Sequence, residues 1–161
     1  MSLISRLLPV ANVTLDLDVT SKKRVFEHVG LLFENQLGIG HTQIFDALFA
    51  RERLGSTGMG HGIAIPHGRI KGLRDAAGSF VRTSAPIPFE APDSQPVNLI
   101  FVLLVPEKAT DLHLRILSEL AQMFSDKDMR AQLTTLPDVT AVQRVIAEWE
   151  PHAPSQRRAA V

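Results

Sequence analysis

Residues 51–74 concentrate the side chains of this chain that could do chemistry. Five basic residues and one acid give this segment a charge of +4, in a chain whose formal net charge is zero. The basic residues are Arg51, Arg53, Arg69, Lys71 and Arg74, the acid is Glu52, and the clustered glycines are Gly55, Gly58, Gly60 and Gly62. Glycine lets the backbone approach a ligand closely, and exposed N–H groups beside basic side chains suit an anion. The segment therefore predicts a phosphate-type site.

Two common phosphate motifs do not fit this segment. The interval from Gly55 to Gly60 is that of a Walker A loop, but His61 and Gly62 stand where that loop needs Lys and Ser or Thr. A dinucleotide fingerprint needs a third glycine at a fixed offset and a helix behind it, whereas a strand is expected here. The sequence gives no support to a bound nucleotide, and no cofactor is expected.

His67 is the first candidate nucleophile. It follows a short apolar strand at residues 63–65 and stands between Pro66 and Gly68. Strand ends are where α/β sheets place ligands, and a neutral imidazole nitrogen can attack phosphorus to give a phosphohistidine. We expect Pro66 to fix the chain direction and Gly68 to leave the ring uncovered. An ordinary turn histidine is the alternative, and it is the commoner role for a lone histidine.

His113 is the second candidate. It falls in the first turn of a predicted helix that begins near Thr110 and Asp111, where free N–H groups and the helix dipole favour an anion. Its spacing to the apolar positions of that helix leaves a half-buried packing role equally open. His61, among the glycines, is placed to touch a ligand. The three histidines lack a His-Glu-x-x-His helix or a carboxylate partner, so no metal site is predicted.

Composition excludes several other classes of protein. The 161 residues are 45% apolar and contain no cysteine, which rules out thiolate nucleophiles and cysteine-bound metals. A neutral net charge argues against a nucleic-acid binder. The longest apolar run, residues 99–105, is far shorter than the roughly 20 residues of a membrane helix. The chain start also lacks the apolar region of a signal peptide. We expect no membrane insertion and a cytoplasmic location.

The elements that must position these residues alternate between two periodicities. Strands are predicted at residues 12–19, 63–65, 78–83 and 97–105, and the last is apolar on both faces, as in a central strand. One helix is expected between a cap at Thr20 or Ser21 and a stop at Gly38, and another after a cap at Thr42. Further helices are predicted from about residue 110, at 128–136 and at 138–149. The pattern predicts one layered α/β domain over residues 1–149 and a disordered tail over 150–161.

The stretch from Arg51 to Arg69, with Ser56-Thr57-Gly58 and Ile65-Pro66-His67-Gly68, resembles the active-site signature of a known family. That family is the IIA domains of the bacterial phosphotransferase system (PTS), of the fructose/mannitol class, and within it the nitrogen-regulatory IIA proteins. The strand end at residues 103–106 and the helix start at 112–114 agree in order and spacing. The resemblance extends to about Trp149 and implies a single type-2 EIIA domain, a mixed β-sheet flanked by helices on both faces.

The resemblance also implies roles for residues of the signature. His67 would accept a phosphoryl group on its distal ring nitrogen, His113 would support the phosphorylated ring, and Arg51 would neutralise the phosphoryl oxygens. The resemblance further implies phosphate contacts from a second basic residue, Arg53, and from the hydroxyls of Ser56 and Thr57. His61 would also support the phosphate, although it departs from the family pattern, in which an Asn between the two glycines is common. No metal or cofactor is implied.

A HPr-like or NPr-like phosphocarrier protein would be the donor, which makes the chain a histidine phosphotransferase. Three outputs stand beside one another. The favoured one is a regulatory switch whose phosphorylation state signals nitrogen, carbon or potassium status to target proteins. The others are a sugar-specific component that passes the phosphoryl group to a IIB domain, and a binding module of the same fold that is never phosphorylated. Intact His67 and Arg51 argue against the last.

Overall fold

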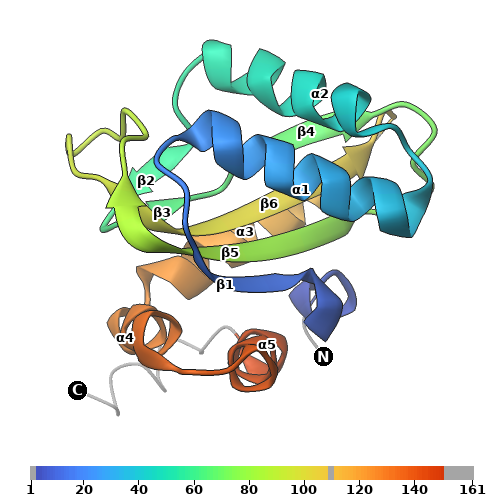
Figure 1. The fold of residues 1–161 in the computed structure, drawn as a ribbon. Coiled ribbons are helices and arrows are strands. Elements are labelled where there is room, and N and C mark those ends of the chain that lie inside the picture. Colours follow the sequence, from blue (N-terminus) through green and yellow to red (C-terminus); the bar gives the residue numbers. More distant parts are fainter. Residues whose placement is uncertain (1–2, 109–110, 151–161) are drawn as a thin grey trace.

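A six-stranded sheet lies between two layers of helices (Figure 1). The computed structural model describes residues 3–108 and 111–150. Two helices cover one face of the sheet and three cover the other: α1 (Lys22–Leu37) and α2 (His41–Arg53) above, and α3 (Asp111–Ser125), α4 (Lys127–Thr135) and α5 (Val139–Glu148) below. Within the described residues, no helix is both long and apolar enough to cross a membrane.

The sheet mixes parallel and antiparallel pairs around one central strand. Its strands are β1 (Val13–Leu17), β2 (Gly58–Gly60), β3 (Ile63–Ala64), β4 (His67–Ile70), β5 (Ala77–Ile87) and β6 (Val97–Pro106). The order is β1-β5-β6-β3-β2, and β4 pairs with β6. β5 runs antiparallel to β6, whereas β3 and β4 run parallel to it. The predicted mixed sheet with helices on both faces is confirmed.

The continuous apolar run of β6 reflects burial on both faces of the strand, because alternate side chains enter two separate cores. Phe101 and Leu103 pack in the cluster between the sheet and α3, α4 and α5. Ile100 and Val102 pack in the cluster beneath α1 and α2. A strand buried on both faces has no polar side to show, so the prediction of a central strand is confirmed.

The helix ends follow the sequence in one case and depart from it in another. Ser21 caps α1, accepting a hydrogen bond from the backbone N–H of Arg24, and Gly38 ends that helix with a φ of 71°. The predicted cap at Thr42 is wrong: α2 begins at His41 after Gly40, without a side-chain cap. The carboxylate of Glu34 accepts the His41 N–H at 2.7 Å instead, so the preceding helix satisfies this donor. Thr110 and, apart from Glu150, the predicted tail lie outside the described residues.

Candidate active site

An interruption between two short strands sets the position of His67. β3 and β4 both pair with β6, and Pro66, which lacks an N–H, lies between them. His67 is the first residue of β4, opposite Leu103. On the far side of that strand, a Cβ added to Gly68 would lie 3.3 Å from the backbone of Ala47 in α2. Gly68 thus allows close packing of α2; the expectation that it serves to uncover the ring missed this contact.

The ring of His67 is held in one tautomer. Its Nδ1 lies 3.0 Å from the carbonyl oxygen of Ile65. Because a carbonyl can only accept, Nδ1 carries the hydrogen and Nε2 keeps its lone pair. Burial, mainly, and the charges of Arg51 and His113 hold the pKa of His67 below its usual value of 6.5, although the Ile65 bond and the Glu52 charge act the other way. The ring is therefore neutral at pH 7, with a nucleophilic Nε2.

His67 lines a cleft of about 270 Å³ at the edge of the sheet. This volume lies just below the roughly 300–1,000 Å³ typical of pockets for small molecules, so the cleft suits a small group. Its walls come from the end of α2, the loop behind it, β2 and α3, and consist of Arg51, Ser56, Thr57, Gly58, Met59, Ile65, His67, Leu117 and Ala121. Four residues that the sequence singles out, Arg51, Ser56, Thr57 and His67, are thus brought together.

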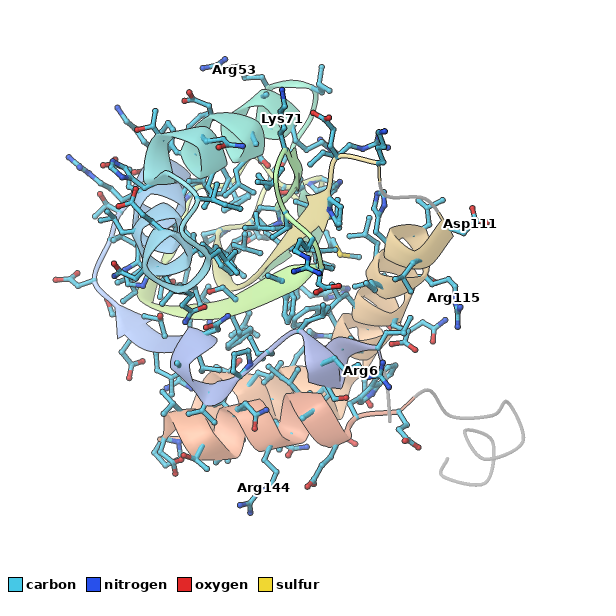
Figure 2. All side chains as sticks on the ribbon, turned by 90° about the vertical axis from the view of Figure 1, so that its right-hand side faces the viewer. Arg6, Arg53, Lys71, Asp111, Arg115 and Arg144 are labelled. Carbon is cyan, nitrogen blue, oxygen red and sulfur yellow. The ribbon has the colours of Figure 1, made fainter. Side chains whose placement is uncertain are left out.

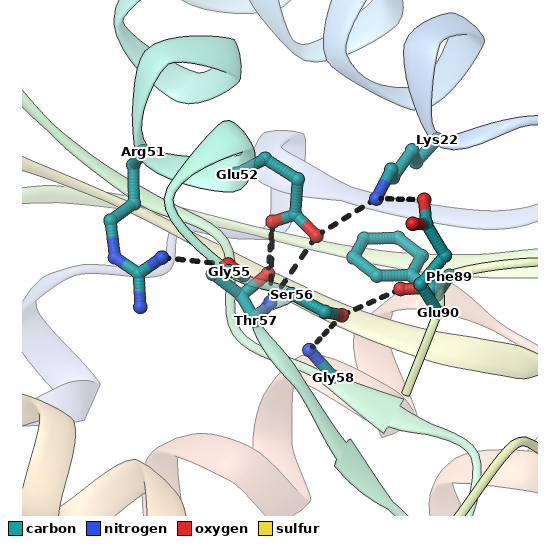
Figure 3. A network of polar contacts seen from close by, with 9 residues as sticks. All are labelled: Lys22, Arg51, Glu52, Gly55, Ser56, Thr57, Gly58, Phe89 and Glu90. Carbon is teal, nitrogen blue, oxygen red and sulfur yellow. Dashed lines mark hydrogen bonds and ion pairs between the residues drawn. The ribbon is translucent and has the colours of Figure 1, made fainter. Parts of the chain in front are cut away.

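Arg51 lies in the last turn of α2 and is tied to the loop that follows. Its Nη1 donates to the carbonyl oxygen of Gly55 at 2.8 Å (Figure 3). A guanidinium has five N–H donors in a rigid fork, and this bond uses one of them. The remaining donors, beside a cleft that also holds His67, suit the oxygens of a phosphoryl group.

Ser56 and Thr57 shape the loop between α2 and β2. The Ser56 hydroxyl donates to the carbonyl of Phe89 at 2.6 Å and accepts from the N–H of Gly58 at 3.0 Å. The Thr57 hydroxyl donates to Glu52 at 2.7 Å. Both hydroxyl hydrogens are therefore donated within the protein, and the predicted donation to a ligand is not the arrangement in this structure. Both residues line the cleft all the same.

His113 lies in the first turn of α3, as predicted, and is 9% exposed. Its Nδ1 has no hydrogen-bond partner among the described residues. Burial and then the charge of Arg69 lower the pKa of His113, and the charge of His113 in turn lowers the pKa of His67. The residue is thus mostly enclosed, with a buried Nδ1, and it is close enough to His67 for their charges to interact.

Like His113, the predicted site residues Arg53 and His61 are not among the residues that line the cleft. The guanidinium of Arg53 stacks 5.7 Å from the ring centre of Phe49, and Figure 2 shows this side chain at the outer surface, well away from the start of α3. His61 sits in the turn between β2 and β3 with a φ of 57°, and its N–H donates to Asp93. Among the described residues, no group of three or more His, Cys, Asp or Glu is arranged to hold a metal ion.

Glu52 and Arg69, which the sequence marks only as charges, do not line the cleft but act on the two candidate histidines. Glu52 is buried and bonded to the cleft wall at Thr57, and Arg69 acts on His113. One signal pointed to Glu52, namely a single acid within a basic, glycine-rich segment. Acidic side chains are rarely buried unless they are paired, and Glu52 is paired with Thr57 and Lys22.

Comparison with known proteins agrees with this fold. The family model for the phosphoenolpyruvate-dependent sugar phosphotransferase system, EIIA 2, matches residues 6–149. The chain belongs to this family. Within it, the chain falls in the nitrogen regulatory branch, since it is 43% identical to a nitrogen regulatory protein of Pseudomonas aeruginosa over 80% of this chain and 84% of that protein.

Solved structures share the fold of this chain. The nitrogen regulatory protein IIA-Ntr of Neisseria meningitidis is 51% identical, with a TM-score of 0.86 over 90% of this chain and 99% of that one. The mannitol enzyme IIA of Escherichia coli, solved in complex with phosphorylated enzyme IIB, shares the fold with a TM-score of 0.74. Its identity is 18%, over 88% of this chain and 98% of that one.

Proposed function

We propose that this protein is a phosphohistidine carrier that accepts a phosphoryl group on Nε2 of His67 and regulates partner proteins through its phosphorylation state. One observation carries the proposal: the Nδ1–H bond to Ile65 leaves a neutral, nucleophilic Nε2 in a cleft that also holds Arg51. The donor is a phosphocarrier protein of the HPr or NPr kind. The cytoplasmic location expected from the sequence stays a prediction.

The transfer step balances without a metal or a base. The Nε2 lone pair of His67 forms the new P–N bond, while the donor's P–N bond breaks and its ring leaves with that electron pair. The proton on Nδ1 stays in place, and the Ile65 carbonyl stabilises the cationic ring that results. Little covalent work remains for the protein, so positioning and charge neutralisation dominate. Arg51, the basic residue among those that line the cleft, supplies positive charge beside His67.

A regulatory output is favoured over sugar uptake by the pattern of similarity. The nitrogen regulatory relatives are 43% and 51% identical, whereas the mannitol enzyme shares only the fold. The test charges the protein with labelled phosphoenolpyruvate, enzyme I and a HPr-type donor, then adds a purified IIB domain of the fructose or mannitol type. We expect charging, with the label retained. Fast onward transfer would favour the sugar-specific role, and a failure to charge would favour an unphosphorylated binding module.

The rate of phosphoryl acceptance should depend on pH only on the acid side. Because the pKa of His67 is lowered from 6.5, more than half of the rings are neutral at pH 6.5, and protonation becomes dominant only at lower pH. Titration of the His67 ring by NMR is expected to give a midpoint below 6.5, and the single-turnover rate should fall through the same pH range. A Pro-His-Gly peptide gives the reference midpoint. A His67 midpoint at or above that of the peptide would contradict this electrostatic description.

Replacing His113 by Ala is expected to slow transfer about 10- to 100-fold while the domain stays folded. The buried ring has an unpaired Nδ1 and lies within electrostatic range of His67, which suits a group that completes the site when the phosphoryl group arrives. The matched control is His28→Gln, which removes a half-buried histidine bonded to Thr14 elsewhere in the fold. Unchanged transfer combined with a collapse of Tm would assign His113 to packing.

A further inference from the structure

We propose that Glu52 is a positioning residue for phosphoryl acceptance, because its buried carboxylate holds the loop that forms one wall of the His67 cleft. The inference rests on the proposed function and adds a residue to its machinery. Figure 3 shows the network around this carboxylate, from the end of α2 to the start of β2.

The Glu52 carboxylate is almost fully enclosed, with 2% of its side chain exposed. It accepts the Thr57 hydroxyl at 2.7 Å and the Thr57 backbone N–H at 3.2 Å. The Nζ of Lys22, the first residue of α1, lies 3.2 Å away. A buried carboxylate is costly unless its oxygens are paired, so these contacts depend on one another and fix Thr57 against the end of α2.

Every residue of the loop from 55 to 58 is tied down through this region. Gly55 is held by Arg51, Thr57 by Glu52, and Gly58 by the Ser56 hydroxyl, which is itself bonded to Phe89. Arg51 and Glu52 are adjacent in one helical turn and hold the loop at two points. Because Ser56, Thr57 and Gly58 line the cleft, release of Glu52 would let this wall move relative to Nε2. A displacement of about 1 Å can slow a transfer about 100-fold.

Lys22 makes a negative charge tolerable beside a site for an anion. Burial alone would lower the pKa of Lys22, but its bonds to Glu90 and Glu52 outweigh that effect and raise it, so the ammonium is charged at neutral pH. Glu52 still acts on His67 from α2, in the opposite sense to Arg51 on α2 and His113 on α3. Glu52 therefore has a geometric effect and an electrostatic effect, and these can be separated by substitution.

The experiment compares Glu52→Ala with Glu52→Gln in single-turnover transfer from a charged HPr-type donor. Glu52→Ala removes the acceptors, so the rate at saturating donor should fall about 10- to 100-fold with donor affinity little changed. Glu52→Gln keeps one oxygen to accept from Thr57, so most of the rate should be retained, while the loss of negative charge lowers the His67 midpoint in the NMR titration. If the carboxylate served only the stability of the fold, the transfer rate and the His67 midpoint would not respond differently to the two substitutions.

Glu90→Gln is the matched control. Glu90 bonds the same ammonium at 3.0 Å, but its side chain is 80% exposed and makes no bond to the loop. We expect a wild-type rate for this variant. Thr57→Val should slow transfer in the wild-type background and add little on top of Glu52→Ala, because both remove the same contact. If Glu52→Ala does not fold, the test compares the two other variants: transfer should be slower in Thr57→Val and nearly normal in Glu52→Gln.

Two failures are distinguishable. If the wild-type protein accepts no phosphoryl group, the proposed function fails. If the wild type is charged and folded Glu52→Ala or Thr57→Val is charged as fast, only the positioning role of Glu52 is overturned. Equal losses in Glu52→Gln and Glu90→Gln would also overturn it, since they would point to a general effect of charge around Lys22.

Discussion

His67→Ala should accept no phosphoryl group while keeping its fold. The substitution removes the one imidazole that lines the cleft, and both hydroxyls of the lining already donate their hydrogens, Ser56 to Phe89 and Thr57 to Glu52. The cost in stability should be small, about 1 kcal/mol, because the half-buried ring makes a single hydrogen bond to the backbone of Ile65. Phosphoryl uptake from labelled phosphoenolpyruvate through enzyme I and a HPr-type protein measures the first effect, and thermal unfolding measures the second.

His61→Asn is the control for that experiment. It replaces a histidine of the same glycine-rich segment that lies outside the cleft, and Asn tolerates the left-handed backbone at this position. Uptake at the wild-type rate is expected. Label retained by folded His67→Ala would mean that another group is the acceptor, and a loss of label from His61→Asn would mean that the hairpin takes part.

Arg51→Ala should slow phosphoryl acceptance about 100- to 1,000-fold, the usual cost of removing one donor aimed at developing charge. The guanidinium lines the cleft and is oriented by its bond to Gly55, so the substitution removes both a positive charge and a hold on the loop. Loss of that charge should also raise the pKa of His67, which Arg51 lowers in the wild type. The acceptance rate of Arg51→Lys should lie between those of the wild type and Arg51→Ala, since an ammonium keeps the charge but lacks the planar fork.

Arg53→Ala is the matched control for Arg51. Arg53 ends the same helix, but its guanidinium lies against Phe49 at the outer surface (Figure 2). Single-turnover rates at saturating donor should match the wild type, because the guanidinium does not line the cleft. A rate for Arg51→Ala within a few-fold of the wild-type rate would contradict a specific contact between Arg51 and the phosphoryl group. An equal loss of rate in Arg53→Ala would indicate a general effect of positive charge instead.

Much of the positioning of His67 follows from local sequence. A strand that is apolar on both faces, a Pro before the histidine and a helix that begins just ahead of His113 are all local signals, and the structure contains each of them. Even the difference between Arg51 and Arg53 follows from helix geometry, since positions two apart point about 200° apart around the axis. Only one of the two can face the cleft.

The remaining features depend on contacts between segments far apart in the chain. In the sequence, Glu52 is one acid in a basic stretch. Its partner Lys22 stands thirty positions earlier and is brought to it by α1. Gly68 looks like a residue that uncovers a ring until α2 is seen packed on it. The Ser56 hydroxyl looks free to donate until Phe89 supplies a carbonyl. Local patterns carry no information on such pairs, so the network behind the cleft could not be predicted.

The central claim is that Nε2 of His67 forms the bond to phosphorus, and NMR of the charged protein tests it most directly. The histidine rings are labelled with ¹⁵N, and the protein is charged by phosphoenolpyruvate, enzyme I and an HPr-type donor. The NMR spectra are then examined for coupling between phosphorus and the ring nitrogens. The expected result is coupling in one ring, assigned to His67, at Nε2, with Nδ1 still carrying its proton toward Ile65. Coupling at Nδ1, coupling in the ring of His113, or a protein that gains no phosphoryl group would contradict it.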